Sequence, residues 1–65
     1  MTLTYDKQAN ALYIKLNNKD VANTKTDDNE QLLIDYASDN AVVGIEILNV
    51  SDKLSMPLQF NFKEI

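Results

Sequence analysis

The densest apolar run of the chain, residues 41–48, most constrains the fold. Its sequence, Ala-Val-Val-Gly-Ile-Glu-Ile-Leu, is rich in β-branched residues, which favour strands. A second apolar run, residues 31–37, precedes it, and only Ser38, Asp39 and Asn40 separate the two. Asp and Asn adopt the positive φ angles of tight turns more readily than other non-glycine residues. The two runs therefore predict an antiparallel hairpin around which the rest of the chain is organised.

Three more segments read as strands. Residues 2–5 and 11–16 alternate apolar and polar side chains with period two, and residues 21–27 have the polar character of an exposed edge strand. Asp6 suits a tight turn between the first two, and Asn10 tolerates the left-handed conformation that ends such a turn. We predict a mainly β fold, a small antiparallel sheet of five to six strands in mostly meander order.

The sequence changes character after residue 48. Asn49 or Ser51 can cap one short helix, and Pro57 prevents its continuation. Residues 58–63 then alternate cleanly and carry both phenylalanines of the chain, as a sixth strand or an extended arm.

The alternation also predicts which side chains form the main core. One face of the predicted strands is consistently apolar, because successive side chains of a strand point to opposite faces. The predicted core residues are Leu12, Ile14, Leu16, Leu32, Ile34, Tyr36, Val43, Ile45 and Ile47.

The amino-acid composition excludes several kinds of functional site. At 65 residues, the chain makes one domain (1–65) with a thin margin of stability. It has no cysteine and no histidine, so disulfides, thiolate metal sites and the usual neutral-pH acid–base group are missing. Small domains are commonly stabilised by disulfides, a metal or a partner. Association, most simply as a homodimer, is the main option left, and we expect no cofactor.

The charge of the chain argues against nucleic acid as a direct partner. The net charge is −4, and all six basic residues are lysines, so no arginine is present to bind phosphates or base edges in a bidentate way. Residues 1–6 lack the pattern of a signal peptide, and no apolar run approaches the roughly 20 residues of a membrane span. We expect a cytoplasmic protein that binds no membrane.

Several of these segments together resemble a known family. Tyr5-Asp6, residues 9–14, residues 33–36 and residues 43–48 resemble the small prokaryotic domain of unknown function family 2283. The resemblance covers residues 5–54 and leaves 55–65 as a C-terminal arm or strand. Asn10 stands where the family usually has an acid, and Val50 where a small residue is common. The resemblance implies a compact antiparallel β domain without an established activity, and some members lie in gene pairs that resemble toxin–antitoxin modules.

Two alternatives remain for a site. Asp6, Asp35 and Glu46 lie in or beside patterned segments, so an oxygen-ligand metal site or a small metal-assisted hydrolase is one hypothesis. A solvated or salt-bridged outer face, with Lys15 as a partner of the acids, is the simpler interpretation. A chain this short hardly encloses the pocket that general acid–base chemistry requires. We therefore predict no catalytic residues and no metal ligands.

A second apolar patch is predicted away from the core face. Either the C-terminal segment of the same chain or another subunit packs on this patch. Both alternatives hold at once if the arm is exchanged between subunits. Gly44, the only glycine, is explained by a bulge, by a close approach of an aromatic ring or backbone, or by a partner. The predicted partner-binding residues are Tyr13, Leu33, Val42, Gly44, Glu46, Leu48, Phe60 and Phe62.

These observations favour a non-enzymatic protein-binding module. It is expected to be antitoxin-like and dimeric, with an acidic surface suited to a basic protein encoded nearby. A structural subunit of a larger assembly is the remaining alternative.

Overall fold

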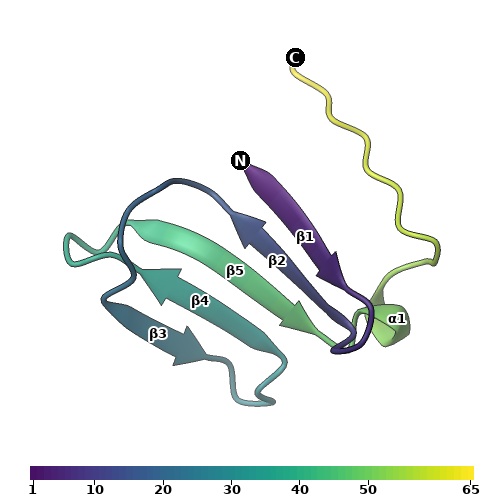
Figure 1. Cartoon of the computed structure of the whole chain (residues 1–65), viewed down its shortest axis with the longest axis horizontal. Helices are drawn as coiled ribbons and strands as arrows, with labels where there is room; N and C mark the ends of the chain where they lie inside the picture. Colours follow the sequence, from purple (N-terminus) through teal and green to yellow (C-terminus); the bar gives the residue numbers. More distant parts are fainter.

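The computed structural model describes residues 1–65 as five antiparallel strands in one open sheet (Figure 1). The strands are β1 (Thr2–Asp6), β2 (Ala11–Lys15), β3 (Asn23–Thr26), β4 (Leu32–Tyr36) and β5 (Val42–Leu48). One short helix, α1 (Val50–Lys53), follows β5 at one end of the sheet. The predicted mainly β fold, with five strands and a helix after Leu48, is confirmed.

The strand order is β1-β2-β5-β4-β3. The pairs β1–β2, β3–β4 and β4–β5 join neighbours in the sequence, as in a meander. The fourth pair joins β2 to β5, so the connection after β2 crosses to the far edge, where β3 lies. The most apolar strand, β5, is thereby placed at the centre of the sheet, between two other apolar strands.

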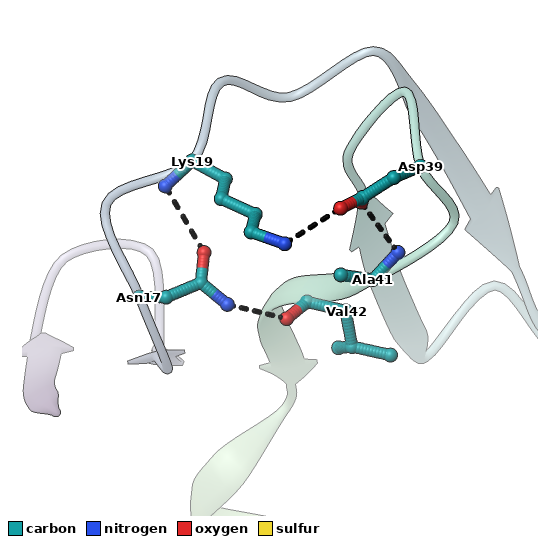
Figure 2. A network of polar contacts seen from close by, with 5 residues as sticks. All are labelled: Asn17, Lys19, Asp39, Ala41 and Val42. Carbon is teal, nitrogen blue, oxygen red and sulfur yellow. Dashed lines mark hydrogen bonds and ion pairs between the residues drawn. The ribbon is translucent and has the colours of Figure 1, made fainter.

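A polar network fixes this crossing connection to the β4–β5 turn (Figure 2). Asn17 Nδ2 donates to the Val42 carbonyl oxygen (2.9 Å), and Asn17 Oδ1 accepts from the Lys19 backbone N–H (3.0 Å). Lys19 Nζ pairs with Asp39 Oδ2 at 2.7 Å. The hydrogen bond from Lys19, and then that from the Ala41 backbone N–H, hold the pKa of Asp39 below its ordinary value. The connection is thus tied to the hairpin that it passes.

Three of the four residues with a positive φ angle are asparagines. Asn10 (φ 53°), Asn40 (φ 67°) and Asn49 (φ 53°) have positive φ, as does Glu30. The predicted left-handed conformation of Asn10 and the predicted turn chemistry at Asn40 are confirmed. Asparagine tolerates this region because its short polar side chain can form local hydrogen bonds.

Helix α1 is attached to the β1–β2 turn through Asn10. The Val50 backbone N–H donates to the Asn10 carbonyl (3.1 Å), and Asn10 Oδ1 accepts from the Ser51 backbone N–H (3.1 Å) and the Tyr5 hydroxyl (3.2 Å). Asn10 Nδ2 donates to Ser51 Oγ (2.9 Å). Asn49 occupies the N-cap position, as predicted, but its side chain makes no capping hydrogen bond, and its Nδ2 donates to Gln31 Oε1. Ser51 lies inside α1 rather than capping it. With four residues, α1 is also too short to span a membrane, and the chain has no other helix that could.

The buried core is smaller than the alternation predicts. Leu12 and Val43 are 3% and 2% exposed, but Leu16 is 39% exposed, so its assignment to the core is wrong. The other predicted core residues are only half-buried: Ile14, Leu32, Ile34, Tyr36, Ile45 and Ile47. Ala11, Ala37 and Val50 complete the buried apolar set. The physical reason is that a single-layer sheet has no second layer to cover its apolar side.

The C-terminal arm, residues 55–65, forms no sixth strand in this structure. After α1 it runs beyond the β1 side of the sheet in an extended conformation (Figure 1). No hydrogen bond connects residues 55–65 to the rest of the chain. The alternation of residues 58–63 therefore has no partner strand within this chain.

Candidate functional site

The polar face of the sheet is organised by Tyr13, Gly44 and Asp35. In the register, Gly44 lies between Lys15 of β2 and Asp35 of β4, and Tyr13 lies opposite Glu46. The Tyr13 side chain reaches diagonally across β5, and its hydroxyl donates to Asp35 Oδ2 at 2.8 Å. Thr24 of β3 donates to the other oxygen, Oδ1, at 2.6 Å. The Asp35 carboxylate therefore links β2, β4 and β3 through side chains.

Gly44 is what allows this crossing. A Cβ atom at residue 44 would lie 2.5 Å from Tyr13 Cζ and 3.0 Å from the Ile14 carbonyl oxygen, and still closer to the Tyr13 hydroxyl oxygen. The close approach of an aromatic ring, one of the explanations predicted for this glycine, is confirmed. The sheet also contains an irregularity, since the register shifts between Asp35 and Tyr36. A side chain at residue 44 would force Tyr13 away from Asp35.

The pKa of Tyr13 lies above its ordinary value of 10.0. The main cause is the hydrogen bond to Asp35, which is lost when the phenol ionises; desolvation and the negative charges of Asp35 and Glu46 add to it. The folded chain therefore holds the proton of Tyr13 more tightly than the unfolded chain does.

This raised pKa predicts an alkaline loss of stability. The contribution of the neutral phenol is fully present below pH 10 and is lost as the pH rises through the raised value of the folded state. We expect the melting temperature of the natural chain to fall more steeply above pH 10 than that of Tyr13→Phe. Thermal unfolding of both proteins across this range measures the difference. Parallel curves would contradict the role of Tyr13.

The three carboxylates of the hydrolase hypothesis do not converge. Asp35 and Glu46 occupy diagonal positions on neighbouring strands, because Asp35 pairs with Gly44 and Glu46 with Leu33. Asp6 lies at the end of β1, where its carboxylate accepts the backbone N–H groups of Gln8 (3.0 Å) and Ala9 (3.1 Å). No group of three acidic side chains is arranged to hold a metal ion, and the surface has no pocket. The geometry gives that hypothesis no support.

The opposite side of the sheet is a continuous apolar surface, which we call the apolar face. The register aligns Leu3, Ile14, Ile45 and Ile34 in one row and Tyr5, Leu12, Ile47 and Leu32 in the next. Most of these side chains are half-buried, and Leu3 is 39% exposed. The sheet has no second layer, and its one helix, α1, lies at one end of it (Figure 1). An apolar sheet face without a covering layer is typical of an interaction surface.

The predicted partner-binding residues fall in three different places. Tyr13, Leu33, Glu46 and Leu48 share the polar face, with Gly44 buried beneath Tyr13. Val42 pairs with Tyr36 beyond the register shift and so leaves the predicted set. Phe60 and Phe62, on the arm, are 59% and 85% exposed. These residues do not form one patch, and their role in binding stays a prediction.

Three residues that contribute to these faces were absent from the predicted sets. Leu3 and Tyr5 extend the apolar face beyond β2, and their period-two alternation was the available signal. Thr24 donates the second side-chain hydrogen bond to Asp35, and no sequence pattern predicts this contact.

A family comparison covers all of these elements except the arm and the end of α1. The family described as Protein of unknown function (DUF2283) matches residues 2–51. The chain belongs to this family. No curated protein and no solved structure matches it. The DUF2283 region contains all five strands and the Asn10–Ser51 contact, whereas residues 55–65 lie outside it.

The geometry accounts for the asparagine at position 10 of this DUF2283 member. Asn10 Oδ1 already accepts from Tyr5 and Ser51, and the Ser51 hydroxyl can donate as well as accept. A carboxylate at this position could accept all three hydrogens. Asn10 therefore attaches α1 to the hairpin, and a carboxylate at this position could do the same.

Proposed function

We propose that this DUF2283 chain is a non-enzymatic protein-binding module that acts as a homodimer through its apolar face. The observation that carries the proposal is the uncovered apolar face on a single-layer sheet. Sheets bury an apolar side against a second layer, and this chain supplies none. A second copy offers an identical face, so two sheets can pack against each other in a two-fold arrangement.

The small core supports the same proposal. Only five apolar side chains are buried in the isolated chain: Ala11, Leu12, Ala37, Val43 and Val50. Association would bury the remaining exposed surface of the half-buried isoleucines at positions 14, 34 and 45, at about 25 cal/mol for each Å² of apolar surface removed from water. The chain has no cysteine, so a disulfide cannot provide this stability instead.

Charge supports an antitoxin-like role for the assembled module. Ten acidic residues against six lysines give a net charge of −4, which favours a basic protein as the partner. A toxin that binds RNA has the required basic surface. The polar face, with Asp35 and Glu46, stays exposed when the apolar faces pack together. We expect the product of a neighbouring gene for a short basic protein to co-purify with this chain, in a complex that high salt weakens.

The homodimer is tested by sedimentation equilibrium of Ile45→Lys. Ile45 lies at the centre of the apolar face, opposite both Ile14 and Ile34. A charge buried there without a partner costs several kcal/mol, so we expect the dimer of the natural chain to become a monomer. Thr26→Lys is the matched control, because it adds the same charge at an exposed position of β3 and should leave the dimer intact. A monomeric natural chain at micromolar concentration would refute the dimer.

A further inference from the structure

Two parts of the molecule have no partner strand within the chain: the outer edge of β1 and the C-terminal arm. Strand β1 pairs only with β2, so the backbone groups along its other edge have no partner strand. The arm carries exposed Phe60 and Phe62 and makes no hydrogen bond with its own sheet. Unpaired edges and extended apolar segments both tend to acquire partners.

The two edges of the sheet are not equivalent. Strand β3 forms the other edge and is exposed throughout, with the sequence Asn-Thr-Lys-Thr. Its Lys25 lies over the Tyr36 ring, 5.5 Å from the centroid, which places a charge on the apolar side of that edge. Lysine at such a position blocks the pairing of strands. Strand β1 has no lysine and no proline, and it presents Leu3 and Tyr5 on the apolar face.

The alternation of the arm matches the two faces of β1. As a strand, the arm places Leu58, Phe60 and Phe62 on one side and Gln59, Asn61 and Lys63 on the other. Beside β1, the apolar set continues the row of Leu3 and Tyr5. The polar set then lies with Thr2, Thr4 and Asp6, where Lys63 carries the charge opposite to that of Asp6. One strand addition satisfies both sides of the edge.

We propose that the arm of one copy adds as a sixth strand to the β1 edge of a second copy, and that the exchange is reciprocal. This inference rests on the proposed homodimer and specifies how the two copies hold each other. A second copy is favoured because the arm makes no hydrogen bond to β1 of its own chain, although it runs beyond that side of the sheet (Figure 1). Each copy therefore keeps one free edge and one free arm, which a two-fold exchange satisfies.

The size of the apolar face gives the arm a further role. Five strands about 4.8 Å apart, with an average length of about five residues at about 3.4 Å for each residue, span a face of about 24 by 17 Å, or roughly 400 Å² in projection. A standard interface takes about 800 Å² of accessible surface from each partner. The exchanged arms would enlarge the contact with two phenylalanines from each copy and with new backbone hydrogen bonds.

The test uses the absence of cysteine from the natural chain. Two full-length single-cysteine variants, Thr4→Cys and Asn61→Cys, are mixed and oxidised, and mass spectrometry measures the mixed disulfide. Gln59→Cys and Lys63→Cys are used beside Asn61→Cys, because a shift of two residues keeps the same face. We expect a disulfide yield with Thr4→Cys at least about tenfold above that with Thr26→Cys, since docking raises the effective concentration. Thr26→Cys is the matched control on the β3 edge.

Each result decides the proposal. Equal yields at both edges, or no mixed disulfide, would overturn the arm exchange. A bridged monomer from the double variant Thr4→Cys/Asn61→Cys, without the mixed disulfide, would assign the arm to its own chain and also overturn it. If the natural chain sediments as a dimer in those cases, the apolar-face dimer stands without the arm. A monomeric natural chain would remove both proposals.

Discussion

Replacing Leu12 with alanine is expected to lower the free energy of unfolding by about 2–5 kcal/mol. Leu12 is 3% exposed and lies between Tyr5 of β1 and Ile47 of β5 on the apolar face. Deleting its isobutyl group removes buried apolar surface and leaves a cavity that the neighbouring strands fill only in part. A domain of this length has a total stability of roughly 3–10 kcal/mol, so the loss takes a large part of it.

Urea denaturation of Leu12→Ala and Leu16→Ala measures this effect. Leu16 lies on the same predicted face but is 39% exposed, so its truncation is expected to cost less than about 1 kcal/mol. The comparison is made at protein concentrations low enough to keep the chain monomeric, because dimer formation adds a concentration-dependent term. Equal losses in the two variants would contradict the burial difference in the isolated chain.

Gly44→Ala is expected to destabilise the chain by about 1–3 kcal/mol, even though alanine is the better strand residue. The added methyl group would lie 2.5 Å from Tyr13 Cζ, so the ring must move away from Asp35. The chain then loses a hydrogen bond to a charged acceptor, worth about 1.5–3 kcal/mol. For a domain of this size, each kcal/mol corresponds to a fall in melting temperature of about 4–8 °C.

A double-mutant cycle with Tyr13→Ala tests the cause. If the clash with the Tyr13 ring is responsible, Gly44→Ala should cost much less in the Tyr13→Ala background, or become stabilising by up to about 1 kcal/mol. Thermal unfolding of the natural chain, the two single variants and the double variant closes the cycle. An unchanged cost in the Tyr13→Ala background would show that the backbone, through the Ile14 carbonyl oxygen, rejects the methyl group instead.

The strands themselves could be predicted from local patterns. Apolar runs, period-two alternation and, for β3, polar edge-strand character placed all five within one or two residues of their observed ends, and Asn40 gave the β4–β5 turn its positive φ. These features depend on neighbouring residues, so the sequence carries them directly. The pairing of β2 with β5 was not predictable in this way, because partners distant in the sequence leave no periodic signal in either strand.

Burial was the least predictable property. Leu12 and Leu16 occupy equivalent positions in the same alternation, yet one is buried and the other exposed. Val50 was singled out only as a departure from the family pattern, although it is completely buried at the start of α1. A pattern states which face a side chain shares, but whether that face is covered depends on the layers available. This chain provides a single layer, which is why its apolar face is the candidate site.

The sequence by itself determined a small antiparallel β domain, its hairpin turns and its membership in a family of unknown function. It also identified Gly44 as a position where something must approach closely, because a lone glycine within a strand needs such a reason. Only the tertiary structure decided what approaches: Tyr13 crosses β5 to reach Asp35. The same is true of the free edge of β1, which arises from the order in which the strands pair, and of the apolar face, which lacks a second layer.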